Sequence, residues 1–155
     1  YSPAVGDVAV TSDQAAGRVD VVFLLADGSS PGPDMVAGLQ EYLRADSIRP
    51  MTDLVMVAAP EKVPYRLDLI YYVNRSDSGR ALAVQAAVRT AVDGYVRWQR
   101  VIGRDVNPSK LLSLVVEAGA KRAEIAAPAF APVASTAVAE LEGAPQVRYG
   151  GLEDD

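Results

Sequence analysis

The sequence contains no histidine and no cysteine in its 155 residues. A Ser-His-Asp triad, a cysteine nucleophile, a thiolate or imidazole zinc site, an iron-sulfur cluster and a disulfide each need one of these two residue types. Most of the chemistry that small enzymes commonly use is therefore excluded. Because cysteine is absent, its usage says nothing about the redox compartment, and secreted and cytosolic locations fit the sequence equally well.

Large aromatic residues, basic charge and long apolar runs are also scarce. With two Phe and one Trp beside seven Tyr, the core must be built mainly from Ala, Val and Leu. The formal charge is −5, and a nucleic-acid partner is not expected because phosphate binding needs a basic surface. No apolar run approaches the roughly 18 residues that a membrane-spanning helix needs, so no membrane span is predicted.

The rest of the composition is that of a protein that folds. Half of the residues are hydrophobic and 23% are charged, and the length suits one compact domain or two small packed modules. The first residues, Tyr1 to Asp7, show neither an initiator Met nor the layout of a signal peptide. We therefore expect the chain to be a piece of a longer protein.

Residues 1–60 predict a first module of the order β-β-α-β. Apolar residues alternate on both sides of a turn-forming stretch, which indicates a β-hairpin whose second strand is buried on both faces. A stretch rich in Gly and Pro then separates this hairpin from a helical pattern, and Pro60 ends the module. The expected elements are strands around residues 8–10 and 19–25, a helix from Met35 to near Asp46 and a strand over 54–59.

Residues 61–155 predict a second module of the order β-α-α-β-β. The clearest period-two pattern indicates one long strand with an apolar face and a polar face. Asn107 followed by Pro108 is a favoured helix start. The expected elements are a strand over 62–74, a helix over 78–102 with Ser76 or Ser78 as cap and Gly103 as stop, a helix from 108 to Gly119, and strands over 121–127 and 146–149.

Between the last two strands lies a stretch without a clean period. Residues 126–145 are rich in Ala and Pro, so we predict an irregular arm with one short helical turn near 138–141. An acidic tail, residues 153–155, ends the chain. The whole pattern predicts an α+β protein of two small packed sandwich modules, with mostly antiparallel sheets covered by helices.

Two polar stretches resemble ligand sites and are better explained as local structure. The glycine-containing loop at residues 28–32 lacks the lysine and the spacing of a phosphate-binding P-loop, so a plain turn is expected. Asp105, Asn107 and Ser109 lack the remaining ligands of a calcium loop, and helix capping accounts for them. No cofactor and no metal is predicted.

Catalysis without histidine or cysteine would have to use Asp, Glu, Lys or Tyr. Asp68 is the one acidic residue in a strongly apolar element, and we expect it to form a surface ion pair with Arg66. The chain is therefore predicted not to be an enzyme. Two alternatives stay open: an enzyme that uses Asp68 and Tyr72, and a small-molecule-binding module with its ligand between the two sandwiches.

Aromatic side chains beside arginines are frequent hot spots of protein interfaces. Trp98 lies in such a setting, and it suits either a core anchor or an interface. Two adjacent tyrosines on the long strand must point to opposite faces, so one of them can meet a second layer or subunit. The apolar residues of the arm also need a surface to pack on. The candidate interface residues are Tyr71, Tyr72, Arg97, Trp98, Arg100, Phe130 and Val133.

Several short motifs follow one another along nearly the whole chain. They are Val5-Gly6-Asp7-Val8, Gly17-Arg18-Val19-Asp20-Val21, Arg49-Pro50, Val57-Ala58-Ala59-Pro60, Val63-Pro64-Tyr65, Gly103-Arg104-Asp105, Asn107-Pro108-Ser109 and Tyr149-Gly150-Gly151. In this order and spacing the chain resembles the C-terminal part of the baseplate J-like family of contractile phage tails, prophages and related injection machines.

The resemblance implies a structural role. Members of this family are wedge components that join one another and neighbouring tail proteins into the ring around the central hub, and they have no catalytic residues to carry over. We therefore expect other baseplate and tail proteins as partners, with a homo-oligomer left open. The expected location is the tail baseplate of a virion assembled in the bacterial host cytoplasm.

Overall fold

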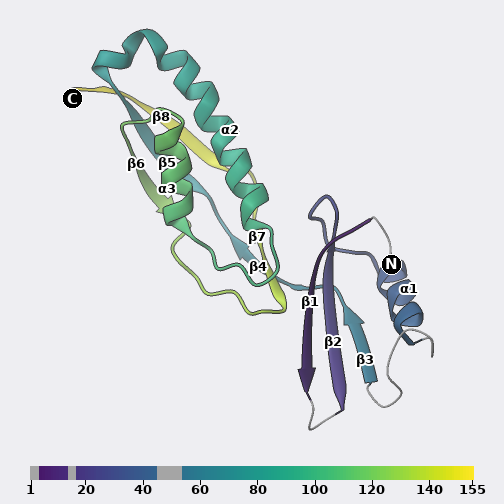
Figure 1. Ribbon diagram of the computed structural model, residues 1–155. Helices are drawn as coiled ribbons and strands as arrows, with labels where there is room; N and C mark the ends of the chain where they lie inside the picture. The colour runs from purple at the N-terminus through teal and green to yellow at the C-terminus, as the bar shows by residue number, and fades with distance from the viewer. Residues whose placement is uncertain (1–3, 14–16, 45–53) are drawn as a thin grey trace. The chain divides into compact units, whose positions relative to one another are not determined.

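The computed structural model describes residues 4–13, 17–44 and 54–155 (Figure 1). The chain divides into two compact units. Unit 1 comprises residues 1–62 together with 101–103 and 134–138, and unit 2 comprises 63–100, 104–133 and 139–155. Unit 1 thus includes two short segments that the sequence pattern placed in the second module.

Unit 1 is built on a three-stranded sheet of order β1-β2-β3. The hairpin expected from the alternating pattern is present, with β1 antiparallel to β2, and β3 lies parallel to β2. Residues 21–24 of the central strand are buried, which confirms a strand covered on both faces. The predicted end of the helix at Asp46 lies outside the described residues. The elements are β1 (Val5–Asp13), β2 (Arg18–Leu25), α1 (Pro33–Arg44) and β3 (Leu54–Ala58).

Helix α1 packs toward one edge of this sheet. Leu39 on the helix is buried with Phe23 of β2 and Val57 of β3 in one apolar cluster. The side chain of Gln40 reaches β3, where its Nε2 donates to the carbonyl oxygen of Val55 and its Oε1 accepts from the N–H of Val57 at 2.7 Å. Within the described residues β3 is an edge strand, so one helix side chain satisfies backbone groups for which the sheet offers no further strand.

The single long strand predicted over residues 62–74 is wrong, because the chain forms two strands there. β4 (Glu61–Tyr65) pairs with β7 (Ala137–Leu141), whereas β5 (Asp68–Asn74) is the centre of a separate sheet. Leu67 lies between the two strands and is buried, so the alternation of apolar residues continues through the break. The pattern therefore could not reveal the change of sheet.

The sheet of unit 2 has the order β6-β5-β8. β6 (Arg122–Ala127) is antiparallel to β5 and β8 (Gln146–Glu153) is parallel to it. Each three-stranded sheet therefore contains one antiparallel pair and one parallel pair, within the expected α+β fold. The helical turn predicted near residues 138–141 is also wrong, because these residues belong to strand β7, and the last strand runs four residues past its predicted end at Tyr149.

Two helices, α2 (Ala81–Gln99) and α3 (Pro108–Glu117), pack against each other, and α3 packs on β6. The predicted helix over 78–102 is shorter at both ends. Residues 75–80 form the 3-10 turn η1 (Arg75–Arg80), and α2 ends at Gln99, before Gly103. Among the described residues no side chain caps the start of η1 or of α2. Asn107 caps α3 as predicted, accepting from the N–H of Ser109 at 3.0 Å, and Gly119 follows its end with a positive φ of 120°.

The long helix buries one polar residue among its apolar ones. Its buried residues are Val84, Val88, Val92, Tyr95 and Gln99. The amide of Gln99 is fully used: its Oε1 accepts from the Tyr95 hydroxyl at 2.9 Å and from the N–H of Asn107 at 3.1 Å, and its Nε2 donates to two backbone carbonyls of the α2–α3 connection. A buried amide with all these partners fixes that connection.

Candidate protein-interaction surface

Strand β5 separates a buried face of its sheet from an exposed one. Leu69, Tyr71 and Val73 are buried, while the residues that alternate with them are only partly covered. On the second face, Tyr72 lies opposite Arg122 of β6, and Ile70 has a charged residue beside it on each neighbouring strand. We call this surface the open face; its members are Asp68, Ile70, Tyr72, Asn74, Arg122, Glu124, Arg148, Gly150 and Glu153.

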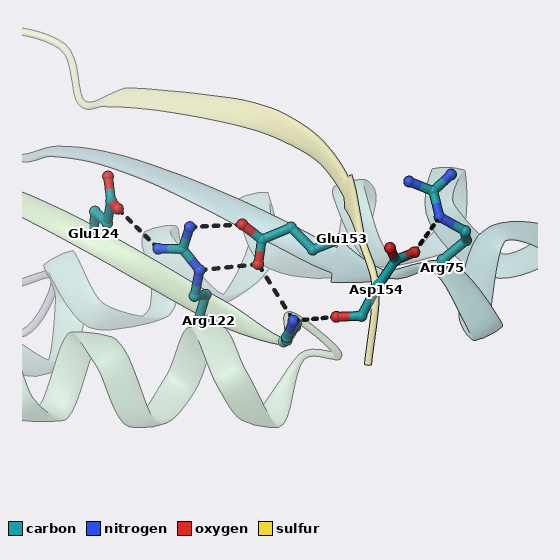
Figure 2. Close-up of polar contacts among 6 residues, drawn as sticks. Arg75, Arg122, Glu124, Glu153 and Asp154 are labelled. Carbon is teal, nitrogen blue, oxygen red and sulfur yellow. Dashed lines mark hydrogen bonds and ion pairs between the residues drawn. The ribbon is translucent and has the colours of Figure 1, made fainter.

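Arg122 is the centre of an ionic network at one end of the open face (Figure 2). Its guanidinium donates two parallel hydrogen bonds to Glu153 of β8, at 2.6 and 2.9 Å, and a third to Glu124 at 2.8 Å. It also lies over the ring of Tyr72, 4.1 Å from the ring centroid. The hydrogen bonds from Arg122 lower the pKa of Glu153 and raise the pKa of Arg122 itself.

The same network holds the end of the chain. Lys121 lies 3.5 Å from the Glu153 carboxylate and donates to the backbone carbonyl of Asp154. Arg75 in η1 donates to the Asp154 carboxylate at 2.7 Å (Figure 2). Residues from three distant parts of the sequence therefore meet around the final strand.

Asp68 forms its ion pair with Arg148 of β8, at 2.8 Å, and not with Arg66 as the sequence suggested. The cause is the register: Arg148 lies beside β5 on the open face, whereas Arg66 belongs to the connection between β4 and β5. Exposed pairs of this kind contribute little stability individually. On the open face, acidic and basic side chains form ion pairs with each other. The apolar groups at its centre are Ile70 and the Tyr72 ring.

A glycine lets Tyr72 lie flat across this face. A β-carbon on Gly150 of β8 would collide with three ring atoms of Tyr72. The ring is thus placed between the Gly150 backbone and the Arg122 guanidinium, spanning all three strands. An aromatic ring over a glycine in a neighbouring strand covers backbone that no side chain protects.

Two of the predicted interface residues are buried within unit 2. Tyr71 is 2% exposed and packs against Tyr149, and Val133 is 7% exposed with its N–H bound to the Asp105 carboxylate at 2.8 Å. Neither side chain is placed to meet a partner directly.

The other predicted residues are at least partly exposed. Trp98 is half-buried, stacked on Tyr95 with Arg104 4.2 Å from its ring centroid, so much of its face is already covered. Arg97 is exposed on α2, and Arg100 forms an ion pair with Glu140 at 3.4 Å. Phe130 is the most exposed aromatic residue among those described, at 63%.

The ligand-site alternatives have structural explanations. Asp105 and Asn107 hold backbone groups, and the loop after β2 closes on itself through Ser29, whose N–H and hydroxyl donate to Asp27. Within the described ranges no group of three acidic side chains is placed to hold a metal ion. In the same part of the chain, no helix has both the length and the apolarity to cross a bilayer.

Sequence comparisons match this chain to known proteins in two consecutive pieces. Residues 2–59 match the baseplate J-like central domain, and residues 70–144 match the baseplate J-like protein C-terminal domain. Baseplate protein J of Escherichia phage P2 is 26% identical over 124 residues, which are 80% of this chain and 40% of that protein. The chain therefore spans about two fifths of the length of this relative.

A solved structure shares the fold. A chain in the cryo-EM structure of the anti-feeding prophage (AFP) baseplate, six-fold symmetrised, superposes with a TM-score of 0.57. The sequence identity is 13%, and the match covers 92% of this chain and 35% of the other. Together, the ordered pair of domains and the phage relative show that the chain belongs to the baseplate J-like family.

Proposed function

We propose that this chain is part of a structural component of a contractile-tail baseplate and acts through protein-protein contacts. The observation that carries the proposal is the succession of a J-like central domain and a J-like C-terminal domain along the chain. The relative from phage P2 is a baseplate protein, which supports the same role. We propose other baseplate proteins as its partners and the tail baseplate, assembled in the bacterial host cytoplasm, as its location.

We further propose that the chain works without catalysis. An enzyme without histidine or cysteine would use Asp68 and Tyr72. The Asp68 carboxylate is bound by Arg148, however, and the Tyr72 ring lies beneath Arg122. Both groups therefore have structural partners on the open face. This arrangement supports a scaffold in which ionic contacts fix strands.

Among the candidate interface residues, we assign partner contacts to the exposed ones. Phe130 projects from the segment after β6, and Arg97 projects from the end of α2. Exposed aromatic and arginine side chains are the residue types that anchor protein interfaces. We propose that these two side chains, with Tyr72 on the open face, contribute contacts in the assembled baseplate.

The test is made in the prophage or phage that encodes the chain. The gene is deleted and then restored on a plasmid with an affinity tag, and particles are examined by electron microscopy after induction. Loss of complete contractile tails on deletion, recovery on complementation and the tag at the baseplate end of the tail would support the proposal. Normal tails from the deletion strain would overturn it.

A second arm of the experiment tests the named residues. Complementation with Phe130→Ser and Arg97→Ser should reduce the yield of complete tails while the variants remain folded. Thr90→Ser is the control. It changes an exposed α2 residue that is neither aromatic nor charged, and it should support a normal yield. Cross-linking and mass spectrometry of the particles then identify the proteins that contact these positions. Full yield from both interface variants would remove them from the proposal.

A further inference from the structure

Unit 1 leaves one edge of its sheet beside an apolar groove. β1 is an edge strand, and its residues Val8 and Val10 are 49% and 61% exposed. They lie opposite Phe23 and Val21 of β2, on the side of the sheet that carries the apolar cluster, but α1 packs toward β3 (Figure 1). A groove of about 250 Å³ therefore lies between β1 and α1, and the described residues that line it are all apolar: Val5, Val8, Val10, Val21, Leu39 and Leu43.

The two edge strands of this sheet, β1 and β3, have different neighbours. At β3, the side-chain amide of Gln40 occupies the backbone groups of Val55 and Val57, so an added strand would have to displace it. β1 pairs with β2 along its length, and its other edge borders the groove. An extended segment that pairs with β1 would hydrogen-bond along the strand and place every second side chain in the groove.

Charge identifies the chemistry of that segment. Residues 1–62 carry nine acidic and four basic side chains, which account for the whole formal charge of −5, whereas residues 63–155 carry eleven of each. A segment with basic residues is therefore attracted to unit 1. A second copy of the same unit is repelled, because it has the same net charge.

We propose that the β1 edge binds an extended strand of a different, neighbouring protein, with alternating apolar residues that enter the groove and basic residues at its ends. The identity of the partner rests on the proposed function: the strand would come from another baseplate protein. The binding surface itself follows from the edge strand, the groove and the charge of unit 1.

The test uses the full chain and defined peptides. The probe is the peptide Lys-Lys-Val-Thr-Val-Thr-Val-Lys-Lys, titrated against the protein while two-dimensional NMR spectra are recorded. The proposal expects saturable shifts of the β1 amides and of the Val8 and Val10 methyl groups. The Val8→Thr/Val10→Thr double variant should bind about tenfold more weakly, because the groove loses two apolar contacts. A peptide with Glu in place of Lys should lose at least as much.

The control is Val116→Thr, which changes a similarly exposed valine on α3 of unit 2 and should leave the affinity within about twofold. Shifts elsewhere on the protein, equal binding of the Lys and Glu peptides, or no binding at millimolar peptide would each overturn the inference. Self-association of the chain through β1 would also overturn it. The titration needs no assembled tail, so its failure leaves the baseplate proposal standing, and normal tails from the deletion strain leave the titration unaffected.

Discussion

The ring of Tyr72 fills the space that a β-carbon on residue 150 would occupy, so only Gly150 fits beneath it. Arg122 covers the other side of the ring and binds Glu153, so β6, β5 and β8 are tied together by side chains as well as by backbone pairing. These side-chain contacts hold the three strands of the open face in place.

Gly150→Ala should destabilise the protein by about 1–3 kcal/mol, because the new methyl group must displace the Tyr72 ring from its place under Arg122. Chemical denaturation measures the loss. Gly79→Ala is the control, since a β-carbon there meets nothing within 4 Å. In a Tyr72→Ala background the Gly150→Ala substitution should cost much less, and strictly additive losses would contradict the steric explanation.

Two buried tyrosines should respond oppositely to removal of their hydroxyls. The Tyr65 hydroxyl is buried and has no hydrogen-bond partner among the described residues, so Tyr65→Phe should leave stability unchanged or raise it. The Tyr95 hydroxyl donates to Gln99, so Tyr95→Phe should cost about 0.5–1.5 kcal/mol. The two variants are matched in burial and chemistry, and thermal or chemical denaturation compares them. Equal losses would contradict the assigned hydrogen bonding.

The buried tyrosines should also make stability fall at alkaline pH. Burial raises the pKa of Tyr65 and of Tyr71 above the ordinary value of 10.0, and it raises the pKa of Tyr95 to about 12. The folded state therefore holds these protons after the unfolded chain has released them. This contribution to stability is complete below pH 10 and is lost as the pH rises through the folded-state values.

Ultraviolet absorbance of tyrosinate checks this prediction. As the pH is raised, part of the tyrosinate absorbance of the folded protein should develop at higher pH than in the same chain in denaturant. Tyr95→Phe should remove part of this difference. Coincident titration curves for the folded and denatured chain would show that these rings are not buried in solution.

Gln40→Ala should cost about 1–2 kcal/mol, because the backbone groups of Val55 and Val57 lose their partner. At high salt, which screens the repulsion between two copies of unit 1, it should also make the chain associate at high concentration through the uncovered β3 edge. Denaturation measures the first effect and sedimentation measures the second. Glu41→Ala, at the next position of the same helix, is exposed and should change neither. A monomeric Gln40→Ala protein of normal stability would mean that this side chain does not protect the edge.

The sequence predicted elements where the signal is local. The hairpin of unit 1 follows from alternating residues, and the start of α3 follows from Asn107 and Pro108, because both depend on neighbours along the chain. The break after Tyr65 escaped prediction because Leu67 continues the alternation while the strand partner changes. β7 escaped because its small residues carry weak strand preference and are stabilised by pairing with β4.

The sequence predicts the side-chain directions on β5 but not which of its two faces is open. The opposite directions of Tyr71 and Tyr72 follow from the strand period, but which side is covered depends on packing. The ionic network could not be anticipated, because Arg122 and Glu153 meet only through the β6-β5-β8 order. Gln40 and Gln99 also gave no signal, because a glutamine on a helix is usually solvated and only the tertiary partners show otherwise.

Unit 1 is completed by residues that lie far along the chain. The Asp7 carboxylate accepts a hydrogen bond from the N–H of Ile102 at 2.8 Å, and the N–H of Gly103 donates to the carbonyl of Ala137. A ribosome adding about 5–20 residues per second needs roughly 4 to 15 seconds to extend the nascent chain from residue 62 to residue 138. Throughout that interval the hairpin has been made but its last contacts have not, so unit 1 cannot finish folding until most of unit 2 has also been synthesised.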